Sequence, residues 1–148
     1  MGKILSVMKI RCFVKGDETQ VLSLWQECDL IAPQNDPLKD IERKLRRDGE
    51  NFLVGELSGL LVATCMVGYD GHRGWINYLA VSPAFRRRGY GAKMMSRAEV
   101  LLRELGCPKI NLQVRAANSA VIRFYRSIGF DMDEVVSLGR RLESDRNS

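Results

Sequence analysis

The sequence predicts a mixed α/β (α+β) domain built around one central sheet. Three apolar stretches follow one another at residues 52–57, 60–67 and 75–81, and Ser58-Gly59 between the first two is a hairpin signal. Consecutive strands of this kind form an antiparallel sheet. Farther along, a helical pattern stands between two strand patterns, which is typical of a parallel pair. The expected sheet therefore has an antiparallel half and a parallel half, with about 6–7 strands and about four helices.

The length and composition of the chain fit one globular domain, expected to span residues 1–148. The sequence is 45% hydrophobic and 28% charged, which suits a core of ordinary size. It has no apolar run of the roughly 20 residues that a membrane-spanning helix needs, and its start is a poor secretion signal. We therefore expect a cytoplasmic protein with no membrane partner and with flexible ends at residues 1–7 and 143–148.

The first part of the chain is expected to hold one strand and two helices. A strand pattern covers residues 9–14. Asp17 and Gln20 then have the spacing of a capping box at the start of a helix. Asp36 followed by Pro37 predicts the N-cap and first position of a second helix. The apolar face of the first helix recurs at helical spacing: Val21, Leu24, Trp25 and Cys28.

The second part of the chain continues with a long helix over residues 89–105, which Gly106 is expected to end. Apolar and polar residues alternate over 110–115, which predicts a strand with two unlike faces. Asn118 then caps a helix that stops at Gly129. Two closing strands are expected at residues 130–132 and 135–142.

The most informative stretch joins a strand to a helix at residues 79–92. The strand ends at Ser82-Pro83, three arginines follow, and an amphipathic helix opens at Gly89. Backbone amides at a helix N-terminus have no intrahelical partner, and the helix dipole adds partial positive charge there. Gly89 and Gly91 allow the backbone to approach a ligand closely. The stretch therefore predicts an anion site, best suited to phosphate.

Several common alternatives do not fit this stretch or the composition. Gly89-x-Gly91 lacks the third glycine of a dinucleotide fingerprint, and no P-loop Gly-Lys-Ser/Thr follows it. Aromatic residues, at 7%, are not interleaved with the arginines, so a base-stacking platform and a nucleic-acid partner are not expected. Four widely spaced cysteines and one histidine do not form the usual zinc sets, so no metal is expected.

Two motifs resemble one known family. Arg86-x-x-Gly89-x-Gly91 is similar to the phosphate-binding signature of the GNAT (GCN5-related) N-acetyltransferase superfamily. The stretch from Asn118 to Phe130 resembles the second signature of that family, an Asn followed by A-x-x-F-Y-x-x-x-G-F, and the order of elements agrees. The resemblance implies the GNAT fold, with strands splayed at the CoA site, and transfer of an acetyl group from acetyl-CoA to a primary amine of a small molecule or protein N-terminus.

The resemblance also implies roles for particular residues. Tyr125 would serve the leaving sulfur as the catalytic residue and lie at the cofactor, and Asn118 would bind the pantetheine or position its helix. The strand backbone would pair with the pantetheine arm through Leu79, Ala80 and Val81. The loop and helix start would hold the pyrophosphate through Arg86, Arg87, Arg88, Gly89, Tyr90, Gly91 and Ala92.

The general base and the acceptor remain open at the level of sequence. The strand before the glycine loop carries no carboxylate, and the nearby candidates are Asp70 and His72 in the preceding loop. Three further acidic residues border the loop that usually covers the acceptor in the family: Glu27, Asp29 and Asp36. The missing carboxylate leaves a second hypothesis open, a non-catalytic CoA-binding module. A homodimer is also left open.

Overall fold

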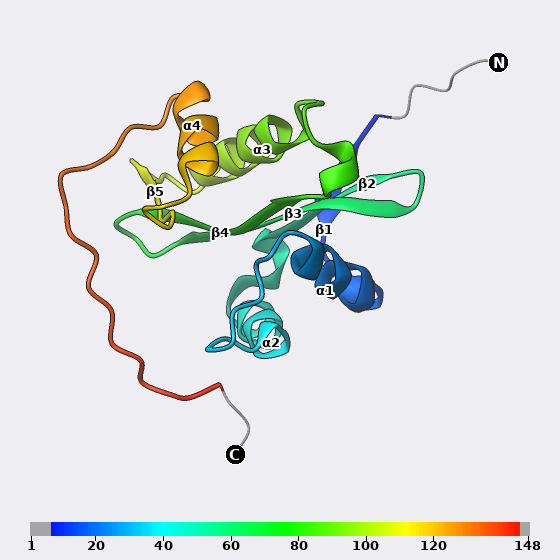
Figure 1. Cartoon of the computed structure of the whole chain (residues 1–148), viewed down its shortest axis with the longest axis horizontal. Helices are drawn as coiled ribbons and strands as arrows, with labels where there is room; N and C mark the ends of the chain where they lie inside the picture. Colours follow the sequence, from blue (N-terminus) through cyan, green and yellow to red (C-terminus); the bar gives the residue numbers. More distant parts are fainter. Residues whose placement is uncertain (1–6, 146–148) are drawn as a thin grey trace.

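The computed structural model describes residues 7–145, in which one five-stranded sheet lies between two pairs of helices (Figure 1). The strands lie side by side in chain order, β1-β2-β3-β4-β5. The first four are antiparallel, and β5 is parallel to β4. The mixed sheet predicted from the sequence is therefore confirmed. The strands are β1 (Lys9–Cys12), β2 (Phe52–Leu57), β3 (Leu60–Tyr69), β4 (Gly74–Val81) and β5 (Ile110–Leu112). The helices are α1 (Glu18–Glu27), α2 (Pro37–Asp48), α3 (Tyr90–Glu104) and α4 (Ser119–Ser127).

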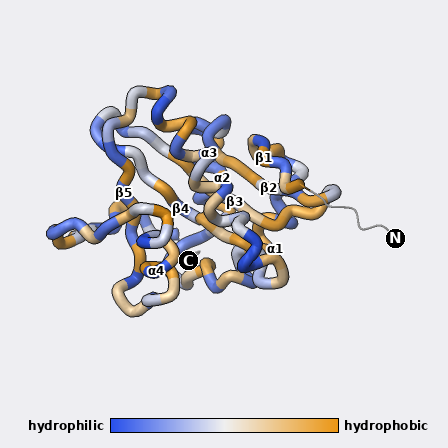
Figure 2. The backbone as a smooth tube through the Cα atoms, turned by 90° about the horizontal axis from the view of Figure 1, so that it is seen from above, coloured by the Kyte–Doolittle hydropathy of each residue, from blue (hydrophilic) through white to orange (hydrophobic). Residues whose placement is uncertain are grey.

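The hairpin between β2 and β3 has the turn that the sequence predicts. Ser58 and Gly59 both have positive φ, of 48° and 84°. Two such residues in succession make a type I′ turn, whose twist matches that of the strands it joins. The central strands are the most apolar part of the chain, and orange follows them in Figure 2.

The two faces of the sheet carry separate hydrophobic cores. Helices α3 and α4 cover one face, and α1 and α2 cover the other (Figure 1). On the first face α3 buries Met94, Ala98 and Leu102 against the strands. On the second face Trp25 and Ile41 are fully buried, together with Phe52 of β2. The apolar faces of the helices therefore lie on the sheet, as the sequence predicts. This packing positions the loop that joins the end of β4 to α3.

The predicted capping box at the start of α1 is wrong. Asp17 stands at the N-cap, but its carboxylate accepts hydrogen bonds from the Val14 amide and from Arg11 instead of capping the helix. Gln20 accepts a hydrogen bond from the Leu61 amide. Arg11 on β1 therefore binds the carboxylate that the sequence pattern predicts to cap the helix.

The two closing strands predicted at residues 130–132 and 135–142 are absent from the described residues, so the sheet has fewer strands than expected. The chain there is extended and runs from α4 past β5 towards α2 (Figure 1). A strand needs a neighbouring backbone, and here only side chains reach β5, such as Gln113 to Ser137.

The ends predicted to be flexible, residues 1–7 and 143–148, lie mostly outside the described residues, because the structure does not describe residues 1–6 and 146–148. Asp145 does not fit the prediction, because it is only 4% exposed and its carboxylate binds Arg43. Within residues 7–145, the helices are too short or too polar to cross a membrane.

Candidate active site

A β-bulge interrupts β4 just before its end. Met66 of β3 faces Asn77, and Thr64 faces Ala80, so Cys65 alone stands opposite two residues of β4. One of these two, Tyr78, has a φ of 52°, which is rare for a residue with a side chain. Bulges of this kind redirect a strand and are common beside active sites.

Two buried hydrogen bonds in series hold the bulge to the core. The indole nitrogen of Trp25 donates to the Thr64 hydroxyl at 2.9 Å, and that hydroxyl donates to the Tyr78 carbonyl at 2.8 Å. Trp25 also stacks on the Tyr78 ring, with 3.8 Å between centroids. Trp25 and Thr64 are both fully buried. The strained conformation of Tyr78 is therefore held by a hydrogen bond to its carbonyl and by stacking on its ring.

Strands β4 and β5 separate towards the bulge. They pair at only three positions, from Gly74 opposite Ile110 to Ile76 opposite Leu112. Beyond Ile76, β4 continues to Val81 without β5 beside it. The strands thus splay where Leu79, Ala80 and Val81 lie; Ala80 is buried and the other two are half-buried. No strand pairs with this edge of β4, although the Val81 carbonyl accepts hydrogen bonds from Arg86 and Cys28.

The loop after β4 leads directly to the N-terminus of α3. Gly89 is the N-cap, with a φ of 81° that favours glycine, and no side chain caps the helix. The first intrahelical bond is donated by the Lys93 amide to Gly89, so the amides before it lack helical acceptors. Tyr90 and Ala92 in this first turn are half-buried. The predicted anion site has the expected backbone.

Gly91 brings three elements together. A Cβ at this position would lie 3.1 Å from the Phe124 ring of α4 and 3.7 Å from Val81 of β4. The absent side chain therefore allows the start of α3 to approach both the end of β4 and α4. The glycine loop and the second motif, distant in the sequence, meet here.

The three arginines of the loop are exposed but differ in direction. Arg86 turns back, and its guanidinium donates to the Val81 carbonyl at 3.1 Å and to the Cys28 sulfur at 3.5 Å. Arg87 has a positive φ of 65°, and Arg88 lies over the Phe85 ring. Arg86 thus braces the end of β4, while the other two add positive charge around the loop.

Helix α4 carries Asn118 and Tyr125 in different settings. Asn118 is exposed and caps the helix by accepting from the Val121 amide at 3.2 Å. Tyr125 is 8% exposed and packs edge-to-face against Phe124 and Phe130. Burial raises the pKa of Tyr125 above its ordinary value. Its hydroxyl is protonated at neutral pH, as that of an ordinary tyrosine is, and it can donate a hydrogen bond.

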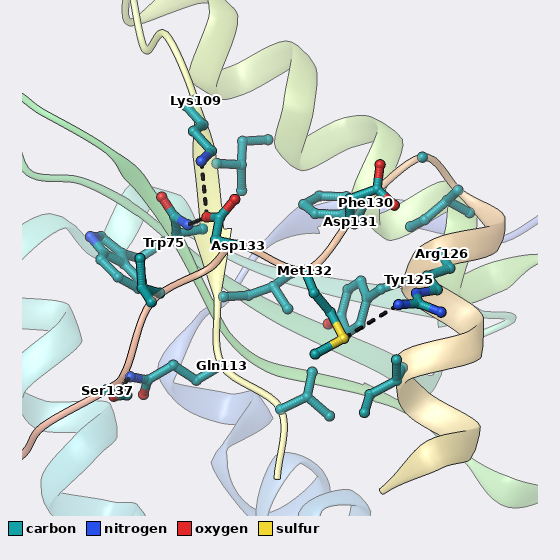
Figure 3. A pocket seen from close by; sticks show the side chains of 18 of the residues that line it. Trp75, Lys109, Gln113, Tyr125, Arg126, Phe130, Asp131, Met132, Asp133 and Ser137 are labelled. Atoms are coloured by element: carbon teal, nitrogen blue, oxygen red, sulfur yellow. Dashed lines mark hydrogen bonds and ion pairs between the residues drawn. The ribbon is translucent and has the colours of Figure 1, made fainter. Parts of the chain in front are cut away.

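Tyr125 also lines a large open groove. The groove has a volume of about 1320 Å³ and lies between β5, α4 and the extended chain after α4. Figure 3 shows Tyr125, Phe130 and Met132 on one side of β5 and Trp75 on the other, while Lys109 and Asp133 meet over the strand itself.

The structure places Asp70 and His72 at the opposite end of β4 from the glycine loop. The Asp70 carboxylate accepts bonds from the His72 and Arg73 amides and from the Trp75 indole. These bonds lower the pKa of Asp70 to about 2, led by the Arg73 amide. Asp70 thus stabilises the turn into β4, and His72 is exposed beside it.

A charged cluster on the α2 side of β4 was not predicted. The Tyr78 hydroxyl donates to Asp40 at 2.6 Å, and Arg43 bridges Asp40 and Asp145 at 3.0 and 2.5 Å. The i,i+4 spacing of Asp40 and Lys44 in the sequence predicts a solvated ion pair, but Lys44 pairs with Asp48 instead. The i,i+3 spacing of Asp40 and Arg43 is the sequence feature that could have indicated their ion pair. No local pattern indicates the contacts of this cluster with Tyr78 and Asp145.

The acidic residues proposed for the acceptor loop have simpler surroundings. Asp36 caps α2 by accepting from the Leu38 amide at 2.9 Å, as predicted. Glu27 and Asp29 are exposed at the end of α1. Asp36 also donates its own amide to Asp145 at 3.0 Å, which joins this loop to the charged cluster.

Comparison with known proteins agrees with this geometry. The family model of the acetyltransferase (GNAT) family matches residues 18–130. An acetyltransferase of Yersinia enterocolitica is 48% identical over 139 residues, covering 94% of this chain and 99% of the relative. An acetyltransferase of Sodalis glossinidius is 49% identical over 140 residues, with the same coverage.

Solved structures share the fold. Aminoglycoside N-acetyltransferase AAC(6')-Iy in complex with CoA superposes with a TM-score of 0.75 at 19% identity, covering 96% of this chain and 99% of that one. Ard1 from Thermoplasma volcanium gives a TM-score of 0.72 at 27% identity, covering 85% and 84%.

Proposed function

The chain belongs to the GNAT acetyltransferase family, and from this membership we propose that it transfers the acetyl group of acetyl-CoA directly to a primary amine of a small molecule or protein N-terminus. The observation that carries the proposal is the convergence at Gly91. There the uncapped start of α3, the splayed end of β4 and helix α4 meet within van der Waals contact.

The residues at this convergence fit a CoA-type donor. Three features hold the anionic end: the free amides between Arg88 and Ala92, the left-handed Gly89, and the charge of Arg87 and Arg88. The edge of β4 without β5 beside it supplies peptide groups of Leu79, Ala80 and Val81 for the pantetheine arm, except the Val81 carbonyl, which Arg86 already holds. Asn118 fixes the start of α4. Acetyl-CoA, when bound, supplies the activated thioester.

The chain's own groups then have separate tasks in the reaction. A backbone amide of the bulged segment stabilises the negative charge that develops on the carbonyl oxygen as the amine attacks. Tyr125 donates its hydroxyl proton to the sulfur as the carbon–sulfur bond breaks, and the proton that the attacking nitrogen loses, passed on through solvent, restores the hydroxyl. Both tasks depend on geometry fixed before the substrates arrive: Thr64 holds the bulge, and aromatic packing holds Tyr125.

The acceptor amine enters from the α2 side of β4. Asp40 is partly exposed there, and its carboxylate already orients the Tyr78 hydroxyl beside the bulge. The structural neighbour AAC(6')-Iy has been solved with a bisubstrate analogue of CoA and acetylneamine. Aminoglycosides therefore belong in the first set of amines to test.

The test is release of free thiol from acetyl-CoA by the purified protein, measured with polyamines, amino acids, aminoglycosides and peptides with free N-termini. We expect release that depends on one class of amine. Binding of acetyl-CoA with no release from any of these amines would instead support the non-catalytic CoA-binding module. Absence of both binding and release would contradict the proposal as a whole.

A further inference from the structure

Arg86, the first residue of the glycine-loop motif, turns back to the strand that it follows. Its guanidinium donates to the Val81 carbonyl at 3.1 Å and to the Cys28 sulfur at 3.5 Å. The Cys28 thiol donates to the same carbonyl at 3.4 Å. These three groups close a small ring, which we call the Arg86 clamp. It joins the glycine loop to the last residue of β4 and to the C-cap of α1, which is Cys28 itself.

The Arg86 clamp binds a carbonyl on the open edge of β4. Ala63 of β3 faces Val81, and the next residue, Ser82, donates its amide to β3 at 2.8 Å. Along an antiparallel pair, successive residues alternate between directing their peptide groups to the partner strand and directing them away from it. The amide and carbonyl of Val81 therefore point away from β3, to the side where β5 no longer pairs. The proposed function assigns this edge to the pantetheine arm of the donor.

The Arg86 clamp also closes the loop that leads to the anion site. The chain leaves β4 at Ser82, makes a 3-10 turn over Pro83–Phe85, and returns at Arg86 to the residue where the strand ended. Gly89, the N-cap of α3, follows shortly after. The bond from the guanidinium to the carbonyl is charge-assisted and is the strongest in the ring, because sulfur is a weak donor and acceptor. This guanidinium thus helps to fix where the free amides of α3 lie relative to the edge of β4.

The two arginines that follow are placed differently. Arg87 and Arg88 are exposed, and the guanidinium of Arg88 lies 5.2 Å from the centre of the Phe85 ring. The ion pairs among the described residues include neither of them. Their charge therefore remains available to an anion at the start of α3.

We propose that Arg86 and Cys28 are positioning residues, which hold the open edge of β4 at a set angle to the anion site, while Arg87 and Arg88 supply the charge that the pyrophosphate meets. Arg86 thereby has a different task from the phosphate contact that its motif implies. The inference rests on the proposed function, because it takes a CoA-type donor to lie across both places. Such a donor benefits from the Arg86 clamp, whereas a ligand that occupies the anion site alone does not.

Two probes separate these tasks in calorimetry. Acetyl-CoA uses both places, and the phosphoadenosine diphosphate part of CoA, which lacks the pantetheine arm, uses the anion site alone. Arg86→Gln should raise the dissociation constant of acetyl-CoA about tenfold and leave that of the shorter probe within about twofold of native. Arg87→Gln is the matched control, because it removes an exposed guanidinium of the same loop; it should weaken both probes by a similar factor.

The outcomes of this comparison are distinct. Equal weakening of both probes by Arg86→Gln would overturn the inference, since Arg86 would then act as a phosphate contact. Native affinity of Arg86→Gln for acetyl-CoA would overturn it as well. A native chain that binds neither probe would instead contradict the proposed function itself. Arg86 is exposed, so its replacement leaves the fold intact, which circular dichroism checks.

The sulfur is tested by a second set of variants. Cys28→Val removes both bonds of the thiol and should raise the dissociation constant of acetyl-CoA about threefold, whereas Cys28→Ser can donate and accept in its place and should restore it. Added to Arg86→Gln, Cys28→Val should have little further effect, because both changes break the same ring; fully additive losses would show that the two residues act separately and overturn the clamp. Cys107→Val is the control, since this half-buried thiol also donates to a carbonyl, that of Lys109, and its variant should bind acetyl-CoA like the native chain.

Discussion

At the scale of single residues, the hydroxyl of Tyr125 has the clearest chemical task. It is protonated at neutral pH, as tyrosine hydroxyls ordinarily are, and a leaving thiolate needs a proton or a hydrogen-bond donor. Tyr125→Phe should lower kcat about 100-fold while changing acetyl-CoA affinity little, measured by thiol release and calorimetry. Tyr69→Phe is the control, since it removes a hydroxyl at the far end of β4. A native kcat in Tyr125→Phe would remove the proposed role.

The backbone of Gly89 tests the anion site. Its φ of 81° and the open space around it are matched by Gly71, which has a φ of 94° and no atom within 4 Å of where a Cβ would lie. Gly89→Leu should weaken acetyl-CoA binding about 10- to 100-fold, because a side chain there displaces charge-assisted hydrogen bonds to the pyrophosphate. Gly71→Leu imposes the same strain away from the loop. Calorimetry should show native affinity for it, and equal losses in both variants would contradict the assignment.

At the scale of elements, the bulge in β4 depends on its support from β3 and α1. Thr64→Val keeps the shape but leaves the Trp25 indole and the Tyr78 carbonyl without a partner. We expect a loss of about 2 kcal/mol in the free energy of unfolding and a lower kcat, because the bulged amide shifts. Thr64→Ser retains the hydroxyl and should recover most of the activity. Denaturation in urea and thiol release measure the two effects, and a native kcat in Thr64→Val would show that the bulge does not need this bond.

The elements divide into those that local patterns specify and those that depend on distant partners. The β2–β3 hairpin, α3 and the caps of α2 and α4 agree with prediction, because Ser58-Gly59, Gly106, Asp36 and Asn118 act within a few residues. The bulge does not follow from the sequence, since it rests on Thr64 and Trp25, far away in the chain.

Two further differences have the same origin. Asp17 could not be assigned correctly, because its partner Arg11 lies on β1. The strands expected after Phe130 are absent because the described contacts of this stretch with β5 are made by side chains, such as Asn111 with Asp133. The glycine loop and α4 motif were recognisable, but only the packing of Gly91 against Phe124 brings them to one place.

At the scale of the whole molecule, Asp145 ties the end of the chain to α2. Arg43 lowers the pKa of this carboxyl most, helped by the Asp36 amide and Arg141, and Lys39 binds its carbonyl. A carboxyl whose pKa is lower in the folded state stabilises the fold fully above its unfolded pKa, about 3.9, and loses this effect as the pH falls below it. Asp145→Asn should therefore lower the Tm at pH 7, and the difference from the native chain should shrink as the pH falls below about 4. Thermal melts followed by circular dichroism, at one fixed protein concentration, measure this difference. Asp131→Asn changes an exposed carboxylate that also lies in the chain after α4; it is the control and should follow the native chain at every pH. A Tm difference for Asp145→Asn that stays constant down to about pH 3 would show that the ion pair with Arg43 does not hold the end of the chain in solution.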